Sequence, residues 1–206
     1  MSRYAHLAYT ESVRREQKEN GSASAGVRAL ARSDAPDPLG AHEAAFIAAR
    51  DGFYLASVSE TGWPYVQYRG GPAGFVHVLD ERTLAFADVR GNRQYITTGN
   101  VRTDGRVALF FMDYPHRARL KVFGHARVTS LEEDSELTRK VMEKRTDGRV
   151  ERLMVIRIEG LNWNCHQHIT PRYSEAELAE ALAPVRARIT ELEEQNKALR
   201  VLLAER

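Results

Sequence analysis

Three short segments of this sequence concentrate arginine, glycine and amide side chains. They span residues 67–71 (QYRGG), 88–94 (DVRGNRQ) and 117–121 (RARLK). Arginine offers a planar fork of donors that suits phosphate oxygens, and the free N–H groups at a helix start add a positive potential. Gly91, Asn92 and Arg93 come just before a short helix predicted at 95–98. The pattern suits a phosphate site, but for a single turn of this kind a solvated turn rich in arginine is the more common case.

A second group of reactive side chains lies near residue 165. His166 and His168 are two residues apart, so on a strand they would share a face and could bind a metal or an acidic substrate. No further ligands accompany them, so a loop pair bonded to backbone is favoured and no metal site is predicted. Cys165 is the only cysteine, which excludes a disulfide within one chain. It is either a small buried apolar residue or a reactive thiolate.

The overall charge limits the class of partner. Thirty Lys and Arg against 28 Asp and Glu leave a net charge of +2, which gives no general attraction to nucleic acid or to an anionic membrane. No apolar run is long enough to span a bilayer, and the start of the chain has no apolar signal core. We therefore expect a cytoplasmic protein that binds neither nucleic acid nor membrane.

The elements that must position these groups are mostly short strands. Runs rich in β-branched and aromatic residues, separated by turn residues, predict strands at 53–58, 65–69, 75–79, 83–87, 107–112, 120–128 and 153–158. Helices are predicted at 41–50 and 132–144. We expect a mainly β (α+β) domain at 41–173, folded as a small antiparallel barrel of six strands, one fewer than the seven runs, with peripheral helices. Residues 1–40, interrupted at 21–26 and 34–40, are expected to form an arm with short helices.

The last segment, 174–206, is different in kind. Ser174 and Glu177 match a capping box, which predicts a helix start. Apolar residues then recur every 3.5 residues, with one Asn in the series. The series is Leu178, Leu182, Val185, Ile189, Leu192, Asn196, Leu199 and Leu203. Pro184 predicts a kink or restart, leaving about three heptads. A coiled coil between two copies and a helix docked on its own barrel both remain open.

Several segments, taken together and in order, resemble those of one protein family. They are 62–65, the strand through Gln67 and Arg69, and the runs 86–94, 106–111 and 122–126. Their order and spacing are similar to the FMN-binding split-barrel proteins related to pyridoxamine 5′-phosphate oxidase. Residues 163–173 further resemble the ending of a subgroup described as probable FMN-dependent enzymes. The resemblance covers residues 40 to 173 and implies a split barrel, FMN as the cofactor, and a homodimer with FMN at the subunit interface.

The resemblance also implies roles for individual residues. Gln67, Tyr68 and Arg69, on one strand, would meet the flavin ring and the phosphate. Asp88 would lie near the ring or the ribityl chain. The three residues after Gly91, which are Asn92, Arg93 and Gln94, would hold the phosphate. Arg119 would reach FMN across the interface, and Trp163 would lie beside the ring. The implied cofactor contacts are Gln67, Tyr68, Arg69, Asp88, Asn92, Arg93, Gln94, Arg119, Lys121 and Trp163.

This chain departs from the family pattern in two ways. The oxidase has cations where Gln67 and Gln94 stand, so Arg69, Arg90 or Lys121 would have to substitute. Its substrate motif is not reproduced, although His166, His168 and Arg172 occupy the same neighbourhood. The sequence therefore predicts a flavin oxidoreductase acting on an unidentified small molecule. The alternative is a non-catalytic flavin or haem binder, and deazaflavin in place of FMN also stays open.

Overall fold

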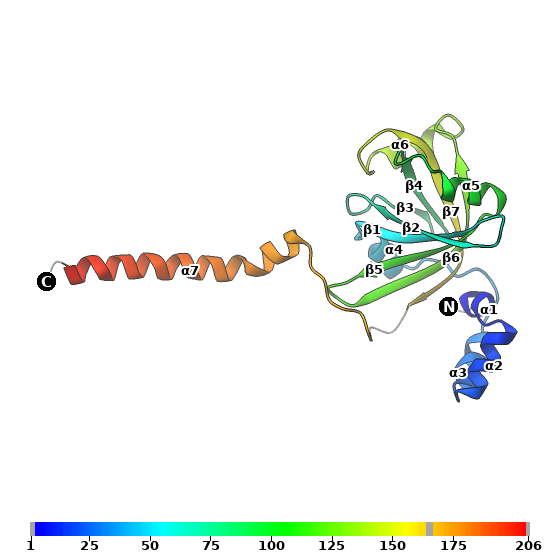
Figure 1. Cartoon of the computed structure of the whole chain (residues 1–206), viewed down its shortest axis with the longest axis horizontal. Helices are drawn as coiled ribbons and strands as arrows, with labels where there is room; N and C mark the ends of the chain where they lie inside the picture. The colour runs from blue at the N-terminus through cyan, green and yellow to red at the C-terminus, as the bar shows by residue number, and fades with distance from the viewer. Residues whose placement is uncertain (1–2, 164–166, 205–206) are drawn as a thin grey trace. The chain divides into compact units, whose positions relative to one another are not determined.

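The computed structural model describes residues 3–163 and 167–204 (Figure 1). The chain forms two compact units. The first contains residues up to 113 and 118–167, and the second contains 114–117 and the residues from 168 onward.

The first unit is built on one antiparallel sheet of seven strands in the order β2-β1-β5-β6-β7-β4-β3. The strands are β1 (Gly52–Val58), β2 (Pro64–Gly70), β3 (His77–Asp80), β4 (Thr83–Val89), β5 (Arg106–Asp113), β6 (Ala118–Thr129) and β7 (Val150–Trp163). The α+β class and the antiparallel pairing are confirmed. Each of the seven predicted β runs forms a strand, so the sheet has seven strands where six were expected. In the described part of the chain β2 and β3 are edges, so the hydrogen-bonded ladder does not close into a ring.

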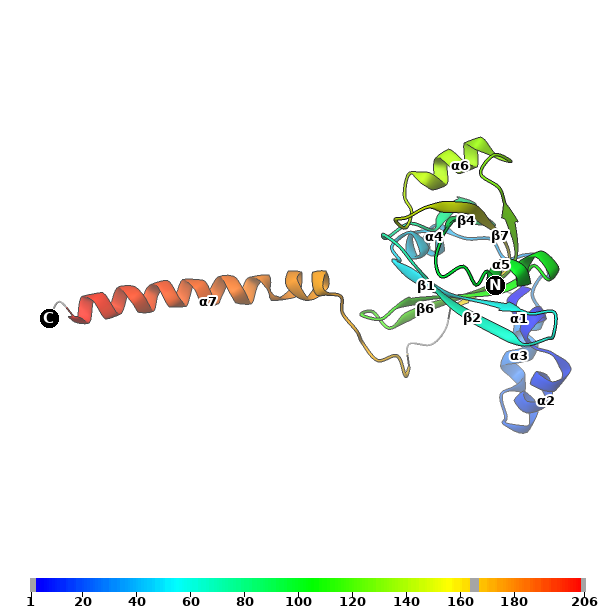
Figure 2. The same ribbon diagram turned by 45° about the horizontal axis from the view of Figure 1, so that its top comes forward.

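The sheet curls around a single main core (Figure 2). Strict alternation in β5 turns Val107, Leu109 and Phe111 inward. The Phe53 ring on β1 lies 4.9 Å from the Phe111 ring and 5.5 Å from the Phe86 ring on β4, measured between centroids. Five of the strands thus share one core, whose large aromatic residues are each worth about 3–5 kcal/mol against truncation to alanine.

β7 is longer than the six residues predicted because its ends pair with neighbouring strands: Val150 and Arg152 pair with β4, and Gly160 to Trp163 pair with β6. Met154, Ile156 and Ile158 point into the main core. Leu153 and Val155 point the other way, into a second cluster that includes Val141 of α6 (Ser135–Met142). The central apolar run is buried on both faces and is visible in the sequence, whereas the polar residues at the two ends join the strand only through pairing with distant segments.

The remaining helices of this unit are short. α4 (Ala41–Ala48) and α6 match the predicted helices at 41–50 and 132–144, and α5 (Ile96–Thr103) extends well beyond the predicted 95–98. The first forty residues contain α1 (Arg3–Ala8), α2 (Glu11–Glu19) and α3 (Ala23–Leu30). The buried carboxylate of Asp37 accepts hydrogen bonds from the backbone N–H groups of Tyr4 and Leu161, which ties α1 to β7.

The second unit contains one long helix, α7 (Glu175–Ala204). Its predicted capping box is present, because the Ser174 hydroxyl accepts from the Glu177 N–H at 3.2 Å and the Glu177 carboxylate accepts from the Ser174 N–H at 2.7 Å. The predicted restart at Pro184 is wrong, since the helix continues through it, and the alternative of a kink there stays a prediction. A proline removes one backbone hydrogen bond, and the long flanking helical segments tolerate that single loss.

No helix in the described ranges 3–163 and 167–204 is both long enough and apolar enough to cross a membrane.

Candidate functional site

A cavity of about 190 Å³ lies between the inner side of β2 and the segment that joins β4 to α5. It brings together six of the ten predicted cofactor contacts: Gln67, Arg69, Asp88, Asn92, Arg93 and Gln94. The other side chains that line it are Tyr65, Val89, Gly91, Tyr95, Ile96, Thr97, Thr98 and Glu151.

The alternation of β2 decides which of its side chains reach the cavity. Tyr65, Gln67 and Arg69 lie on the inner face and line it, whereas Val66 and Tyr68 point to the outer face. Gln67 pairs across β1 with the buried Leu55, so its side chain sits where the apolar core gives way to the polar cavity. The structure therefore separates the Tyr68 side chain from its two neighbours.

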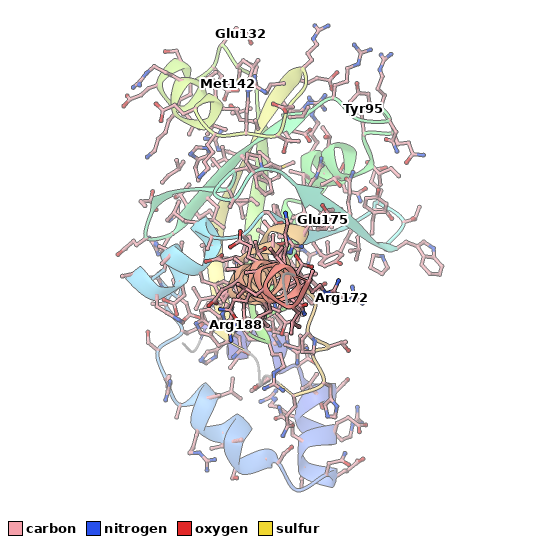
Figure 3. The ribbon with its side chains drawn as sticks, turned by 90° about the vertical axis from the view of Figure 1, so that its left-hand side faces the viewer. Tyr95, Glu132, Met142, Arg172, Glu175 and Arg188 are labelled. Carbon is pink, nitrogen blue, oxygen red and sulfur yellow. The ribbon has the colours of Figure 1, made fainter. Side chains whose placement is uncertain are left out.

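The turn between β4 and α5 has an unusual backbone. Arg93 and Tyr95 adopt left-handed conformations with φ of 63° and 54°, which non-glycine residues rarely take. The Asn92 side-chain oxygen supports the turn by accepting from the Gln94 N–H at 3.2 Å. Tyr95, labelled in Figure 3, directly precedes α5, and its side chain makes no capping hydrogen bond to this helix start. Because Ile96, Thr97 and Thr98 line the cavity, the positive end of α5 opens into it.

Side-chain hydrogen bonds fix α5 to the sheet. The Thr97 hydroxyl donates to the Gln67 side-chain oxygen at 2.9 Å. One turn later the Asn100 amide donates to the Ser57 hydroxyl at 3.0 Å, and both of these residues are buried. Gln67 therefore positions the helix start, a role that a cation at the same position would not fill in this way.

An ion cluster forms the floor of the cavity. The buried Asp88 carboxylate accepts from Arg69 Nη1 at 2.8 Å and lies 3.6 Å from Arg152 Nε. The Arg152 guanidinium also contacts the Glu151 carboxylate and donates to the Thr98 hydroxyl at 3.3 Å. Arg69 Nε is buried and lacks a hydrogen-bond partner among the described residues.

Glu151 links this cluster to the turn above it. The Tyr95 hydroxyl donates to Glu151 at 3.2 Å and accepts from Arg93 Nε at 3.5 Å. The bond to Tyr95 raises the pKa of the Arg93 guanidinium above its ordinary value. Arg90 Nε lies 3.7 Å from Glu151. The lining of the cavity therefore carries two guanidinium groups (Arg69 and Arg93) and two carboxylates (Asp88 and Glu151). Arg90 and Arg152 do not line the cavity, but their guanidinium groups contact these carboxylates.

Sequence reasoning missed Tyr95, Glu151 and Arg152 as parts of this site. Arg152 reaches it because β4 pairs with β7 in a register that sets Asp88 opposite Arg152. This register joins segments far apart in the chain, and no local pattern in the sequence reports it. Tyr95 was within reach of sequence reasoning, since it directly follows the predicted phosphate triplet at the helix start.

The outer face of the sheet is apolar and exposed. Val66 and Tyr68 on β2 have exposed fractions of 58% and 57%, and Tyr54 on β1 pairs with both Tyr68 and Phe110 of β5. The Tyr54 and Tyr68 rings are 5.4 Å apart between centroids. A contiguous exposed apolar patch of this kind marks an interaction surface.

Two predicted cofactor contacts lie on this outer face instead of the cavity. Arg119 and Lys121 pair with Met112 and Phe110 of β5, on the side of β6 opposite the buried Leu120. The Arg119 guanidinium is 6.0 Å from the Phe110 ring centroid, and the Lys121 ammonium is 5.2 Å from that of Tyr4. Within one chain they do not line the cavity.

Trp163, at the end of β7, contacts α4. Its indole N–H donates to the Glu43 carboxylate at 2.7 Å, and its ring lies 4.7 Å from those of His42 and Phe46. Burial alone would raise the pKa of the Glu43 carboxyl. The hydrogen bonds from Trp163 and the backbone outweigh burial, so the pKa lies below its ordinary value.

The substrate-side predictions fall elsewhere. His166 lies outside the described residues, as does Cys165. His168, in the second unit, is exposed and has a φ of 61°. Arg172, in the same unit, places its guanidinium 5.2 Å from the Tyr114 ring centroid. Their role toward a substrate stays a prediction. Among the residues the structure describes, no three His, Cys, Asp or Glu side chains gather as a metal site.

Comparison with known proteins places this geometry in a family context. The family model described as pyridoxamine 5′-phosphate oxidase matches residues 39–162, which is more than half of the chain. No curated protein sequence matches.

Among solved structures, HupZ of Group A Streptococcus is 16% identical, with a TM-score of 0.50, and the match covers 66% of this chain and all of HupZ (100%). A histidine-to-alanine variant of HupZ is 15% identical, with a TM-score of 0.50, covering 61% of this chain and 98% of the variant. A candidate pyridoxamine 5′-phosphate oxidase from Lactobacillus delbrueckii is 22% identical, with a TM-score of 0.48. The match covers 61% of this chain and 94% of that protein. The likeness to HupZ is one of fold.

Proposed function

The chain belongs to the pyridoxamine 5′-phosphate oxidase family, and from that premise we propose that it binds FMN in the cavity at the start of α5 and works as a flavin oxidoreductase. The observation that carries the proposal is the convergence of three features on one cavity. These are the uncapped start of α5, the turn of Asn92, Arg93 and Gln94, and the inner side chains of β2.

The donor set fits a phosphate monoester. The Tyr95 side chain leaves the first N–H groups of α5 uncapped, and Arg93 stands beside them on an exposed turn. The lining itself is balanced, with Arg69 and Arg93 against Asp88 and Glu151. Arg90 and Arg152, outside the lining, contact the same two carboxylates, so the cluster as a whole has an excess of two positive charges. A dianionic phosphate would balance that excess.

The two cations that the family pattern has and this chain lacks are compensated locally in this proposal. Gln67 holds Thr97 at the helix start and thereby orients the backbone N–H groups. Arg69 contributes positive charge at the cavity floor. Its guanidinium group is held in place by the Asp88 carboxylate. Arg93, whose side chain is exposed at the cavity rim, is the residue we assign to the phosphate itself.

Bound FMN would supply the redox chemistry, by accepting or donating a hydride. The tasks of this chain are then to hold the phosphate, to orient the ring and to admit a small molecule. In this proposal Tyr65 and Gln67, on the inner side of β2, would contact the ring, and Asp88 would contact the ring or the ribityl chain. The substrate is a small molecule whose identity the described residues do not specify.

We assign the apolar outer face of β2, β1 and β5 to a homodimer interface. A second copy covering Val66, Tyr68 and Tyr54 would remove a large exposed apolar patch from water. It would also bury the outer face on which Arg119 and Lys121 lie. This arrangement accounts for why these two residues are absent from their own chain's cavity, since in a dimer each would serve the site of the partner.

The proposal is tested on the purified full chain. We expect a yellow protein that releases FMN on acid treatment, and an apoprotein that binds added FMN. Arg93→Met should weaken FMN binding at least ~tenfold, because it removes a charge-assisted contact to the phosphate. It should leave the binding of riboflavin, which has no phosphate, unchanged. Arg102→Met, on the last turn of the same helix, is the matched control and should change neither.

Turnover separates an oxidoreductase from a carrier. Bound FMN that is reduced by a nicotinamide cofactor and reoxidised by a second substrate supports the enzyme. A protein that binds FMN but shows no such reduction would be a flavin carrier. For haem, the described lining of the cavity contains no histidine, cysteine or methionine, the side chains that most often hold its iron.

A further inference from the structure

α7 carries an apolar seam that runs almost its whole length. The seam consists of Leu178, Leu182, Val185, Ile189, Leu192, Leu199 and Leu203, with Asn196 as its one polar member. Exposed fractions of its apolar members range from 43% at Leu182 to 70% at Leu203, and every described residue of α7 is exposed. Most of the stability of a helix in a protein comes from packing its apolar face, so this seam requires a partner.

The shape of the seam indicates what kind of partner it fits. Spacing that alternates between four and three residues places the members at the two core positions of a heptad, a and d. Four of the eight flanking e and g positions between residues 179 and 202 are charged: Arg186, Arg188, Glu193 and Arg200. The other four are Ala179, Ala181, Gln195 and Leu202. A helix docked on a globular core needs a wider apolar face, with a third apolar position in each heptad. Leu202 is the one large apolar side chain at the flanking positions between residues 179 and 202, so the seam is narrow over most of its length and fits another helix of the same kind.

We propose that α7 pairs with α7 of a second copy of this chain, as a parallel, in-register two-stranded coiled coil. This pairing does not depend on FMN binding. Pro184 falls at heptad position c, on the outside of such a coil, so it leaves the seam intact. The seam extends from Leu178 to Leu203, about 38 Å at ~1.5 Å per residue.

Asn196 sets the orientation. It occupies an a position, and in a parallel, in-register pair it faces the same amide of the second copy, where the two side chains can hydrogen-bond to each other. An antiparallel pair of the same overlap would set Asn196 against Val185. That arrangement would bury the amide without a partner, which is strongly unfavourable in an apolar seam.

The charged flanks complement one another between two copies. In the parallel pair, Arg188 at position g faces Glu193 at position e of the next heptad on the second helix, and the same contact recurs by symmetry. Within one helix, Arg188 Nη1 binds the Glu191 carboxylate at 2.6 Å (Arg188 is labelled in Figure 3). Arg188 therefore binds Glu191 within its own helix and, in the proposed pair, also faces Glu193 of the second copy.

The test is cysteine cross-linking in the full chain, with Cys165→Ser as background. Val185→Cys and Leu199→Cys introduce one thiol each at d positions that lie about 21 Å apart along the helix. Glu194→Cys, at the outer position f, is the matched control. After mild oxidation, we expect most of the chains to form disulfide dimers with a thiol at 185 and equally with one at 199. We expect at least ~tenfold less dimer with a thiol at 194, because position f lies on the outside of the coil.

Other outcomes overturn the proposal. A cross-link at only one of the two d positions, or at neither, overturns the parallel, in-register pair. An antiparallel pair of the same overlap places residue 185 against residue 196 and residue 199 against residue 182, so neither thiol would meet its own copy. Equal cross-linking at all three positions indicates chance collision. Asn196→Leu provides a second measurement that keeps the helix apolar and folded. In sedimentation equilibrium this variant should form a mixture of dimers and higher oligomers. An unchanged dimer would contradict the placement of Asn196 opposite Asn196 of the second copy. Both readouts work without FMN, so they are separate from the test of the flavin site.

Discussion

Arg69 on β2 donates to the Asp88 carboxylate on β4 at 2.8 Å, and the side chains of both residues are largely buried, with exposed fractions of 17% and 8%. β2 is at one edge of the sheet and β4 is next to the other edge, so this pair bridges the two sides of the curled sheet. Arg152 on β7 approaches the same carboxylate at 3.6 Å. One buried anion thus holds two cations at the floor of the candidate flavin site.

Replacing that anion should destabilise the whole first unit. Asp88→Asn leaves two partly buried guanidinium groups without a counter-charge, and we expect a loss on the order of 3 kcal/mol in the free energy of unfolding. Denaturant unfolding followed by circular dichroism measures it. Asp104→Asn removes the partner of the exposed Arg106 and should have little effect. Equal effects of the two variants would mean that the Arg69–Asp88 pair is not buried in solution.

Adding a cation at residue 94 should strengthen FMN binding. Gln94→Arg places a charge at the cavity rim, and we expect about fivefold tighter binding at low salt, fading as ionic strength rises. Gln67→Arg adds the same charge but removes the hydrogen bond that Thr97 donates, so it should give less gain. Titration of apoprotein with FMN and with riboflavin measures both. Tighter riboflavin binding in Gln94→Arg would show that the added cation does not act on the phosphate.

The Glu43–Trp163 contact should make stability depend on acid. The pKa of Glu43 is lowered in the folded state, so its stabilisation is fully present above the unfolded-state pKa and is lost as pH falls through the folded-state pKa. We expect the melting temperature to fall between about pH 5 and about pH 3, near and below the ordinary glutamate range. Trp163 fluorescence in a Trp63→Phe background reports the contact. Glu43→Gln should flatten this part of the profile, and an unchanged slope would refute the assignment.

The outer sheet face and α7 are expected to hold the dimer together independently. A charge at the centre of an apolar contact is strongly unfavourable. The double variant Val66→Asp/Leu192→Asp should therefore be monomeric in sedimentation velocity. Val27 on α3, with an exposed fraction of 66%, provides the matched control. Val27→Asp/Leu192→Asp should remain dimeric through the sheet face. Dimers of the first double variant would place the interface elsewhere.

Much of the fold followed from local pattern. The capping box at Ser174 and Glu177 formed as predicted because its hydrogen bonds join residues close in the chain. The strand ranges followed from β propensity and turn residues, and the phosphate triplet lies at a helix start as its sequence indicated. Pro184 was misjudged because its cost depends on the rest of a 30-residue helix.

The sequence by itself determined which residues alternate, where helices begin, and which segments carry cations and amides, because these properties depend on neighbours a few positions away. Only the tertiary structure decided which face of each strand is inside. It placed Gln67 and Arg69 in the cavity and turned Tyr68, Arg119 and Lys121 to the outer face. It also brought Asp88 to Arg152 and Thr97 to Gln67. These contacts depend on strand register between distant segments, which is set when the sheet curls around its shared core.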